Sequence, residues 1–277
     1  MTRGMGFRPD SLWDQWDDQW SRHAVSTIGR VGLLPMSASA SSLRCDWRHL
    51  LDRVSDQKNS NSCVGQFVSN AVYLAGQAGH SLGRCAVVKR PSVLWSYAVA
   101  RLRDLAAQGV PAAQRMAYLH DDGCQPRMMM LGCQENGLVA EERWPFDLAS
   151  INAAIPFDLD IGAADATLTG WYGISAPGSP DVMRAALDAG HFPGFALEVH
   201  ENFTDASGAE TYSDVRGDLV GYHMITAIGH RPGAILILNS WSENWGDGGC
   251  LWISDDIIAS PYVTHRMIVT AAPSGLA

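Results

Sequence analysis

One cysteine of this sequence lies where a thiol gains reactivity, at the beginning of an apolar helix. Apolar residues recur with helical spacing from Val64 to Ala75, so Cys63 falls in the first turn. A helix N-terminus together with a neighbouring imidazolium lowers a thiol pKa from about 8.5 to about 3.5–7.5. Cys63 is therefore predicted to act as a nucleophile if the fold supplies a histidine.

A histidine and an asparagine near the other end of the sequence form the second candidate group. The strands on either side of GHRPG, residues 229–233, are expected to pair as a β-hairpin. With the loop centred on Arg231, His223 lies directly opposite Asn239, and opposed Cβ atoms are about 4.5–5.5 Å apart. The Asn239 amide oxygen would then accept an imidazole N–H and orient His223 as the general base for Cys63.

Gln57, six residues before Cys63, completes the set. Acyl transfer requires hydrogen-bond donors aimed at the oxyanion of the tetrahedral intermediate. The backbone N–H of Cys63 is one such donor, and the Gln57 side-chain amide is the natural second. These residues predict nucleophilic acyl transfer, with no metal and no other cofactor.

The elements that carry these residues divide the sequence into a helical half and a strand-rich half. Helical patterns cover 64–75, 92–107, 126–135 and 180–189, and strand patterns cover 168–176, 193–200, 222–229, 234–239, 250–254 and 265–272. We expect Gly76 and Gly79 to end the first helix. This order predicts an α+β fold with two lobes and a cleft between them.

Three parts are expected along the chain. Residues 1–45 form an N-terminal extension, residues 46–150 a helical lobe with Cys63, and residues 151–277 a β-rich lobe with His223.

Three tryptophans mark the N-terminal extension. Trp13, Trp16 and Trp20 are spaced as one stripe of a short helix, with Asp10 or Ser11 as its N-cap. The stripe is interpreted as packing on the protein's own body, and docking of a protein partner is the alternative.

Composition and charge limit the partners. The 277 residues carry a formal charge of −9 and contain no cluster of Lys and Arg, which argues against DNA or RNA as a partner. The sequence shows no signal-peptide pattern and no apolar run of about 18 residues, so we expect no membrane partner and a location in the cytoplasm or within a larger assembly. The six cysteines lack zinc-type spacing, and the histidines other than His223 are interpreted as structural or solvent-facing.

Together these segments resemble the papain-like cysteine peptidases, in particular their microbial branch. DQKNSNSCVGQF is similar to the family's glutamine–loop–cysteine segment, GYHMITAIGH to its histidine strand, and ILNSWSENWGDGGCLWI to its Asn-Ser-Trp signature. The spacings from Gln57 to Cys63 and from His223 to Asn239 match those of the family, and the resemblance covers about residues 45–272. It implies a papain-like two-lobe fold, with a helical N-terminal lobe and a β-barrel-like C-terminal lobe, and hydrolysis of protein or peptide substrates.

The resemblance also implies roles for residues around the chemistry. Trp241 corresponds to the indole that shields the Asn–His hydrogen bond from water. Gly123 and Cys124 fall where the family pairs its backbone with an extended substrate. Pro126 and Met224 would flank the pocket for the second side chain before the scissile bond, where an apolar residue is expected.

Three residues depart from the family's pattern. Tyr222 stands where a smaller or polar residue is common and would crowd the cleft. Cys124 adds a side chain at the strand-pairing edge, and Ser242 replaces the glycine expected after Asn-Ser-Trp. These departures bear on substrate preference more than on the reaction.

Two alternatives remain open on the sequence alone. One is a module that kept the fold and lost turnover, acting as a structural or binding component of a larger assembly. The other keeps the catalytic residues and changes the bond or the acceptor, as in an amidase acting on cell-wall peptides or a transpeptidase.

Overall fold

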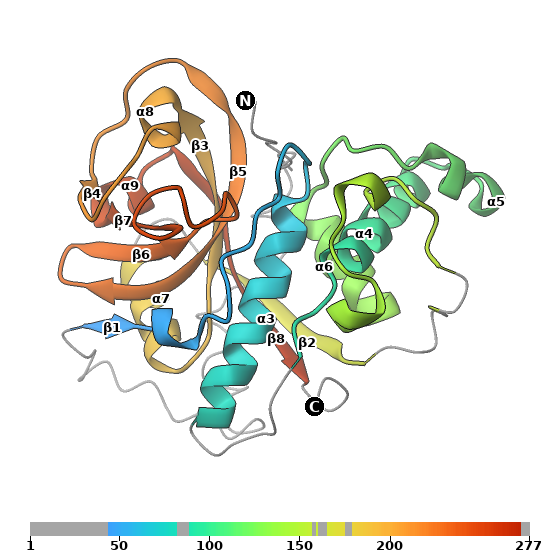
Figure 1. Cartoon of the computed structure of the whole chain (residues 1–277), viewed down its shortest axis with the longest axis horizontal. Helices are drawn as coiled ribbons and strands as arrows, with labels where there is room; N and C mark the ends of the chain where they lie inside the picture. Colours follow the sequence, from blue (N-terminus) through green and yellow to red (C-terminus); the bar gives the residue numbers. More distant parts are fainter. Residues whose placement is uncertain (1–43, 82–88, 157–158, 160–164, 175–178, 273–277) are drawn as a thin grey trace. The chain divides into compact units, whose positions relative to one another are not determined.

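A computed structural model describes residues 44–81, 89–156, 159, 165–174 and 179–272, which fall into two units (Figure 1). The first unit contains Gln57–Gly170 and the end of the chain from Thr270, and the second contains Trp171–Val269 and the segment that ends at Asp56. Helices dominate the first unit and a sheet dominates the second, which confirms the predicted α+β class. The division of the chain at residues 45 and 150 stays a prediction, and the tryptophan helix lies outside the described residues.

Three helices build the first unit. They are α3 (Cys63–Ser81), α4 (Val93–Ala107) and α6 (Pro126–Asn136). The Ser92 hydroxyl accepts the Trp95 N–H at 3.2 Å and so caps α4, and Pro126 begins α6, where its missing N–H costs no hydrogen bond. The shorter helices of the described chain are η1 (Arg48–Leu50), α5 (Ala112–Arg115), η2 (Met116–Tyr118), η3 (Glu141–Arg143), η4 (Leu148–Ser150), α7 (Ser179–Asp188), α8 (Glu201–Thr204) and α9 (Asp255–Ala259).

Helix α3 is longer than the sequence predicted. It passes through Gly76 and Gly79 and ends at Ser81, so the prediction that these glycines end it is wrong. A glycine inside a helix costs about 1 kcal/mol relative to alanine. Leu74 and Ala78 are buried on either side of Gly76, and this packing outweighs the cost.

The second unit is organised around strand β5. The strands are β1 (Cys45–Asp46), β2 (Thr167–Gly173), β3 (Gly194–His200), β4 (Thr211–Tyr212), β5 (Leu219–Arg231), β6 (Ala234–Leu238), β7 (Cys250–Ser254) and β8 (Val263–Ala272). Their order in the sheet is β2-β8-β3-β5-β6-β7-β4, and β1 pairs with β5. β5 is antiparallel to β1, β3 and β6, and α7 packs against it (Figure 1). This central place fixes the backbone around His223.

The β5–β6 hairpin forms, but its register differs from the prediction. The turn is Pro232–Gly233 and the loop is not centred on Arg231, because β5 continues to Arg231 and β6 begins at Ala234. Thr226 pairs with Leu238, and a bulge shifts the register between Ala227 and Gly229.

His223 is therefore not directly opposite Asn239, and that part of the prediction is wrong. The Thr226–Leu238 register, continued by one residue, places Asn239 opposite Ile225, two residues beyond His223. Since side chains alternate with a period of two, a shift of two residues keeps both side chains on the same face of the sheet. The two residues become diagonal neighbours.

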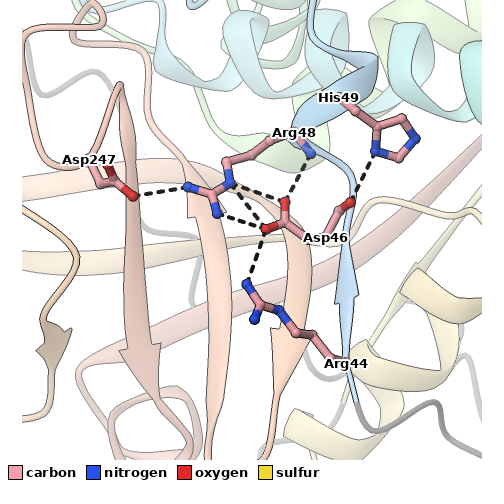
Figure 2. A network of polar contacts seen from close by, with 5 residues as sticks. All are labelled: Arg44, Asp46, Arg48, His49 and Asp247. Atoms are coloured by element: carbon pink, nitrogen blue, oxygen red, sulfur yellow. Dashed lines mark hydrogen bonds and ion pairs between the residues drawn. The ribbon is translucent and has the colours of Figure 1, made fainter.

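A network of charged groups fixes β1 in the second unit (Figure 2). The Asp46 carboxylate accepts hydrogen bonds from the Arg48 guanidinium, the shortest 2.8 Å, and Arg44 lies 3.8 Å away. Arg48 also donates to Asp247 at 2.9 Å, in the segment between β6 and β7. Burial raises the pKa of Asp46, but the hydrogen bonds and charge of Arg48, with the charge of Arg44, outweigh burial and lower that pKa below its usual value.

We expect Asp46→Asn to lower the free energy of unfolding by about 1 kcal/mol near neutral pH, since both partners are partly exposed. A carboxyl whose pKa is lower in the folded state than in the unfolded state contributes its full stabilisation of the fold above the unfolded-state pKa of about 4. This stabilisation is lost as the pH falls through the lower, folded-state pKa. Urea unfolding at pH 7 and at pH 3 should show the difference from wild type shrinking in acid. Asp214→Asn is the control, because its ion pair with Arg216 is exposed at both ends and should contribute less than about 0.5 kcal/mol. If the loss of unfolding free energy in Asp46→Asn were the same at pH 3 as at pH 7, this account would be contradicted.

Two further findings concern the described chain as a whole. Its cysteines at positions 45, 63, 124, 133 and 250 form no disulfide bond with one another. Among the described residues, no helix combines the length and the apolar character needed to cross a bilayer.

Candidate functional site

The loop before α3 is held by hydrogen bonds between its own groups. The Gln57 side-chain amide donates to the Ser60 carbonyl oxygen at 2.9 Å, and the Ser60 hydroxyl donates to the Gln57 carbonyl oxygen at 2.7 Å. The Ser62 carbonyl oxygen accepts the Gln66 N–H at 3.0 Å, which closes the first turn of α3. Gln57 and Cys63 are both fully buried. The loop thus fixes the Gln57 amide relative to the backbone N–H of Cys63.

Asp121 connects this loop to the predicted substrate-binding segment. Its carboxylate accepts the backbone N–H of Asn61 at 2.9 Å, and its carbonyl oxygen accepts from the Asn61 side-chain amide. The Tyr97 hydroxyl donates to the same carboxylate at 2.8 Å and accepts the Gly123 N–H at 2.9 Å. Asp121 and Tyr97 therefore hold the loop before Cys63 and the Gly123 backbone in one framework.

The predicted substrate-binding residues of the first unit lie in the segment that follows Asp121. Gly123 has a φ of 78°, in the left-handed region that favours glycine. Cys124 is fully buried, and Pro126 is the first residue of α6. Their contact with a substrate stays a prediction.

His223 and Asn239 meet in the second unit. The His223 Nε2 and Asn239 Oδ1 atoms are 2.7 Å apart, and both residues are fully buried. Asn239 Oδ1 also accepts the backbone N–H of Ser240 at 2.8 Å, which identifies this atom as the oxygen. An oxygen acceptor requires a proton on His223 Nε2, so in the neutral ring Nδ1 carries the basic lone pair.

Aromatic rings cover this hydrogen bond. The Trp241 ring stacks on the His223 ring with centroids 4.7 Å apart and an interplanar angle of 24°. Phe203 contacts Trp241 edge to face, and Trp245 does the same at 5.5 Å. Since water is excluded from a buried polar pair of this kind, its electrostatic attraction is strengthened. The Trp241 ring lies over His223, and its shielding role stays a prediction.

The other predicted residues of the second unit flank His223 along β5. Tyr222 pairs with Glu198 and Met224 with Ala196, in β3. Alternation along the strand places the Tyr222 and Met224 side chains on the face opposite that of His223. Met224 is buried and Tyr222 is half-buried, and their contacts with a substrate stay predictions.

The segment after Asn239 depends on unusual backbone angles. The Asn239 N–H donates to the Gly249 carbonyl oxygen at 2.9 Å, and Gly249 has a φ of 82° with Val54 packed where a Cβ would lie. Ser242 has a φ of 68°, a conformation that suits glycine better. Serine at position 242 therefore carries backbone strain that a glycine would avoid.

Sequence reasoning missed three residues that hold the candidate site. Asp121 gave no signal, because it contacts Asn61 across 60 residues of sequence. Phe203 lies far from Trp241 in the sequence, on α8. Trp245 carried a readable signal, since it stands four residues after Trp241 in SWSENW.

The chain was compared with known proteins. No protein-family model and no curated protein matches the sequence. Solved structures do match, among them xylellain, a cysteine protease from Xylella fastidiosa, with a TM-score of 0.71, 18% identity, and coverage of 97% of this chain and 96% of xylellain. The chain has the papain-like cysteine peptidase fold.

Two other structures with the papain-like fold support this assignment. Procathepsin B from Trypanosoma congolense matches with a TM-score of 0.66 and 14% identity over 98% of this chain and 87% of that protein. The bromelain protease from Ananas comosus matches with a TM-score of 0.60 and 15% identity over 83% of this chain and 99% of that protein. The resemblance inferred from the sequence segments is thus confirmed at the level of the papain-like fold.

Proposed function

We propose that the chain is a cysteine peptidase that hydrolyses peptide bonds through an acyl-enzyme intermediate, a thioester on Cys63. The observation that carries the proposal is the buried 2.7 Å hydrogen bond between His223 and Asn239 under the Trp241 ring. It fixes the one tautomer in which His223 Nδ1 serves as a base, and nucleophilic catalysis by a thiol requires such a base. The papain-like fold supports the proposal, because its solved examples include cysteine proteases.

In the proposed reaction, His223 Nδ1 takes the Cys63 proton and the thiolate attacks the carbonyl carbon of the scissile bond. The C–S bond forms, and the resulting oxyanion is stabilised by the Cys63 N–H and by the Gln57 amide. The imidazolium then gives its proton to the leaving amine as the C–N bond breaks. His223 then deprotonates a water molecule, which attacks the thioester carbon. The C–S bond breaks, the carboxylic acid leaves, and the imidazolium returns its proton to the Cys63 sulfur.

The proposed substrates are proteins or peptides in extended conformation. Their backbone would pair with Gly123 and Cys124, and an apolar side chain before the scissile bond would lie against Pro126 and Met224. Strict preference for a charged residue in a peptide-substrate profile would contradict the apolar pocket.

Reaction with a thiol-directed epoxide tests the proposal, because it separates reactivity from accessibility. Cys63 is fully buried, whereas Cys45 is the most exposed of the cysteines that the structure describes. Burial, together with the charges of Asp188 and Asp46, raises the pKa of Cys45 to about 12. We therefore expect the epoxide to modify Cys63 first at neutral pH, as read by peptide mass spectrometry.

Cleavage of a denatured protein substrate completes the test. Modification of Cys63 should abolish cleavage, and a chain blocked elsewhere should keep it. Uniform slow labelling of all thiols, with no cleavage of the protein, would contradict the peptidase and favour a binding module. Selective labelling with turnover only of peptidoglycan fragments would instead indicate an amidase.

A further inference from the structure

A second group of reactive side chains lies within the second unit, away from the residues of the proposed peptidase chemistry. One sulfur, one carboxylate oxygen and one ring nitrogen, from Cys45, Asp188 and His230, all lie within 4.8 Å of one another. They come from β1, the last residue of α7, and β5. The sequence indicates a structural or solvent-facing role for His230 and shows no zinc-type spacing, since the three residues are far apart in the chain.

The pairing of β1 with β5 brings the first two side chains together. Cys45 lies directly opposite His230 in the antiparallel ladder, so both side chains share one face. The close approach depends on Gly229, because a Cβ at that position would lie 2.6 Å from the Cys45 carbonyl oxygen. This backbone contact fixes Cys45 relative to the buried His230 ring.

Helix α7 supplies the carboxylate. The Trp47 indole N–H donates to the Leu187 carbonyl oxygen at 3.1 Å and anchors the end of the helix beside β1. The next residue, Asp188, then approaches His230, with 2.8 Å between its Oδ1 and the ring Nε2. The His230 side chain is 1% exposed and the Asp188 side chain 23% exposed, while Asp188 as a whole residue is exposed, so the group is closed around His230 and open to the surface at Asp188.

The donor atoms of the group suit a divalent cation. The Asp188 carboxylate lies with the Cys45 sulfur and the His230 ring nitrogen inside 4.8 Å, and the nearby Asp46 carboxylate is bound by Arg48 (Figure 2). A divalent cation among the three atoms would bind the sulfur as a thiolate and would be balanced in charge by the carboxylate.

We propose that Cys45, Asp188 and His230 bind a divalent cation of the zinc class, with a water molecule as the fourth ligand. Thiolate and imidazole select Zn²⁺ and similar ions over Mg²⁺ and Ca²⁺. In a tetrahedral zinc site neighbouring ligand atoms are about 3.3–3.8 Å apart, which small side-chain rotations reach from the present positions. On binding, the Cys45 S–H bond breaks and its proton goes to solvent as the sulfur–metal bond forms. The proton between His230 Nε2 and Asp188 Oδ1 also leaves, as the ring takes its other tautomer with the proton on Nδ1, and both atoms then bind the metal.

Bound metal would join β1, β5 and α7 across the second unit. A ligand that binds only the folded state stabilises it by RT ln(1 + [L]/Kd), where [L] is the free ligand concentration. The site therefore goes beyond the peptidase proposal and concerns the stability of the segment that leads toward Gln57 and Cys63.

Calorimetric titration with Zn²⁺ tests the site in the full chain. The chain with Cys45 and the chain with Cys45→Ser are compared, and both also carry Cys63→Ala. This second replacement removes the thiol that the proposed mechanism pairs with the His223 imidazole. We expect one Zn²⁺ per chain, bound with micromolar or tighter affinity. Adding Cys45→Ser should weaken this affinity by at least about 100-fold, more than is usual for a residue that only hydrogen-bonds to a metal ligand. Asp181→Asn, an exposed carboxylate on the same helix, is the matched control and should bind as before.

Co²⁺ provides a second measurement that does not depend on how Cys45→Ser folds. Bound to the Cys63→Ala chain, it should give a thiolate-to-cobalt charge-transfer band and the intense visible bands of four-coordination. The absence of that charge-transfer band, or equal Zn²⁺ affinity with and without Cys45, would overturn the proposal. Failure of the peptidase test would leave this result unaffected, since the three ligands take no part in that chemistry.

Discussion

Replacing Cys63 with alanine is expected to lower kcat/KM on a peptide substrate by at least about 10⁴-fold. The thiolate is the only group of the chain that forms a bond to carbon in the proposed mechanism, and its removal leaves binding and oxyanion stabilisation alone. Initial rates with a fluorogenic peptide, compared at equal concentrations of folded chain, measure the effect.

Cys133→Ala is the matched control for this variant. Cys133 is a fully buried thiol on α6, and its sulfur contacts the Met129 sulfur at 3.7 Å. Its removal should cost about 1 kcal/mol of stability and leave kcat/KM unchanged within about twofold. Equal activity of Cys63→Ala and wild type would show that another group performs the chemistry.

Replacing His223 with alanine is expected to lower kcat by at least about 10³-fold, the second large effect. In the proposed mechanism the buried ring supplies both proton transfers, and its tautomer is set by the 2.7 Å hydrogen bond to Asn239. Asn239→Ala should have a smaller effect, about 10–100-fold, because the ring remains and loses only its orientation and fixed tautomer.

The double variant distinguishes a catalytic pair from two separate structural defects. If Asn239 acts only through His223, the chain with both replacements is no slower than His223→Ala alone. Multiplication of the two single effects in the double variant would contradict that coupling. Thermal unfolding of all three chains shows how much of any loss is structural.

The sequence was sufficient to predict the elements that carry the candidate residues. Helical periodicity placed Cys63 at the start of a helix, and α3 does begin there. Alternation and turn residues placed His223 and Asn239 on neighbouring strands, and the structure joins them by a hydrogen bond. Such local patterns arise because one face of a helix or strand is buried, and the spacing of apolar residues in a single sequence indicates that face.

What the sequence did not predict depends on register and on distant contacts. The two-residue turn at Pro232–Gly233 and the bulge between Ala227 and Gly229 together set the hairpin register, and neither could be read from the residue pattern. The prediction of where α3 ends was wrong, because packing around Gly76 outweighed the low helix propensity of glycine. Neither the Asp121 framework nor the Cys45–Asp188–His230 group could be predicted, because each depends on tertiary pairing of segments far apart in the chain.

The central claim is that the Cys63 thiol and the His223 imidazole act as one nucleophile–base pair. The rate of Cys63 alkylation, measured from about pH 5 to about pH 9 in the wild type and in His223→Ala, tests it most directly. The account predicts that His223→Ala slows alkylation by at least about tenfold near pH 6 and that the two rates converge near pH 9, where a free thiol ionises by itself. Identical rate profiles in the two chains would contradict the pairing of the two residues.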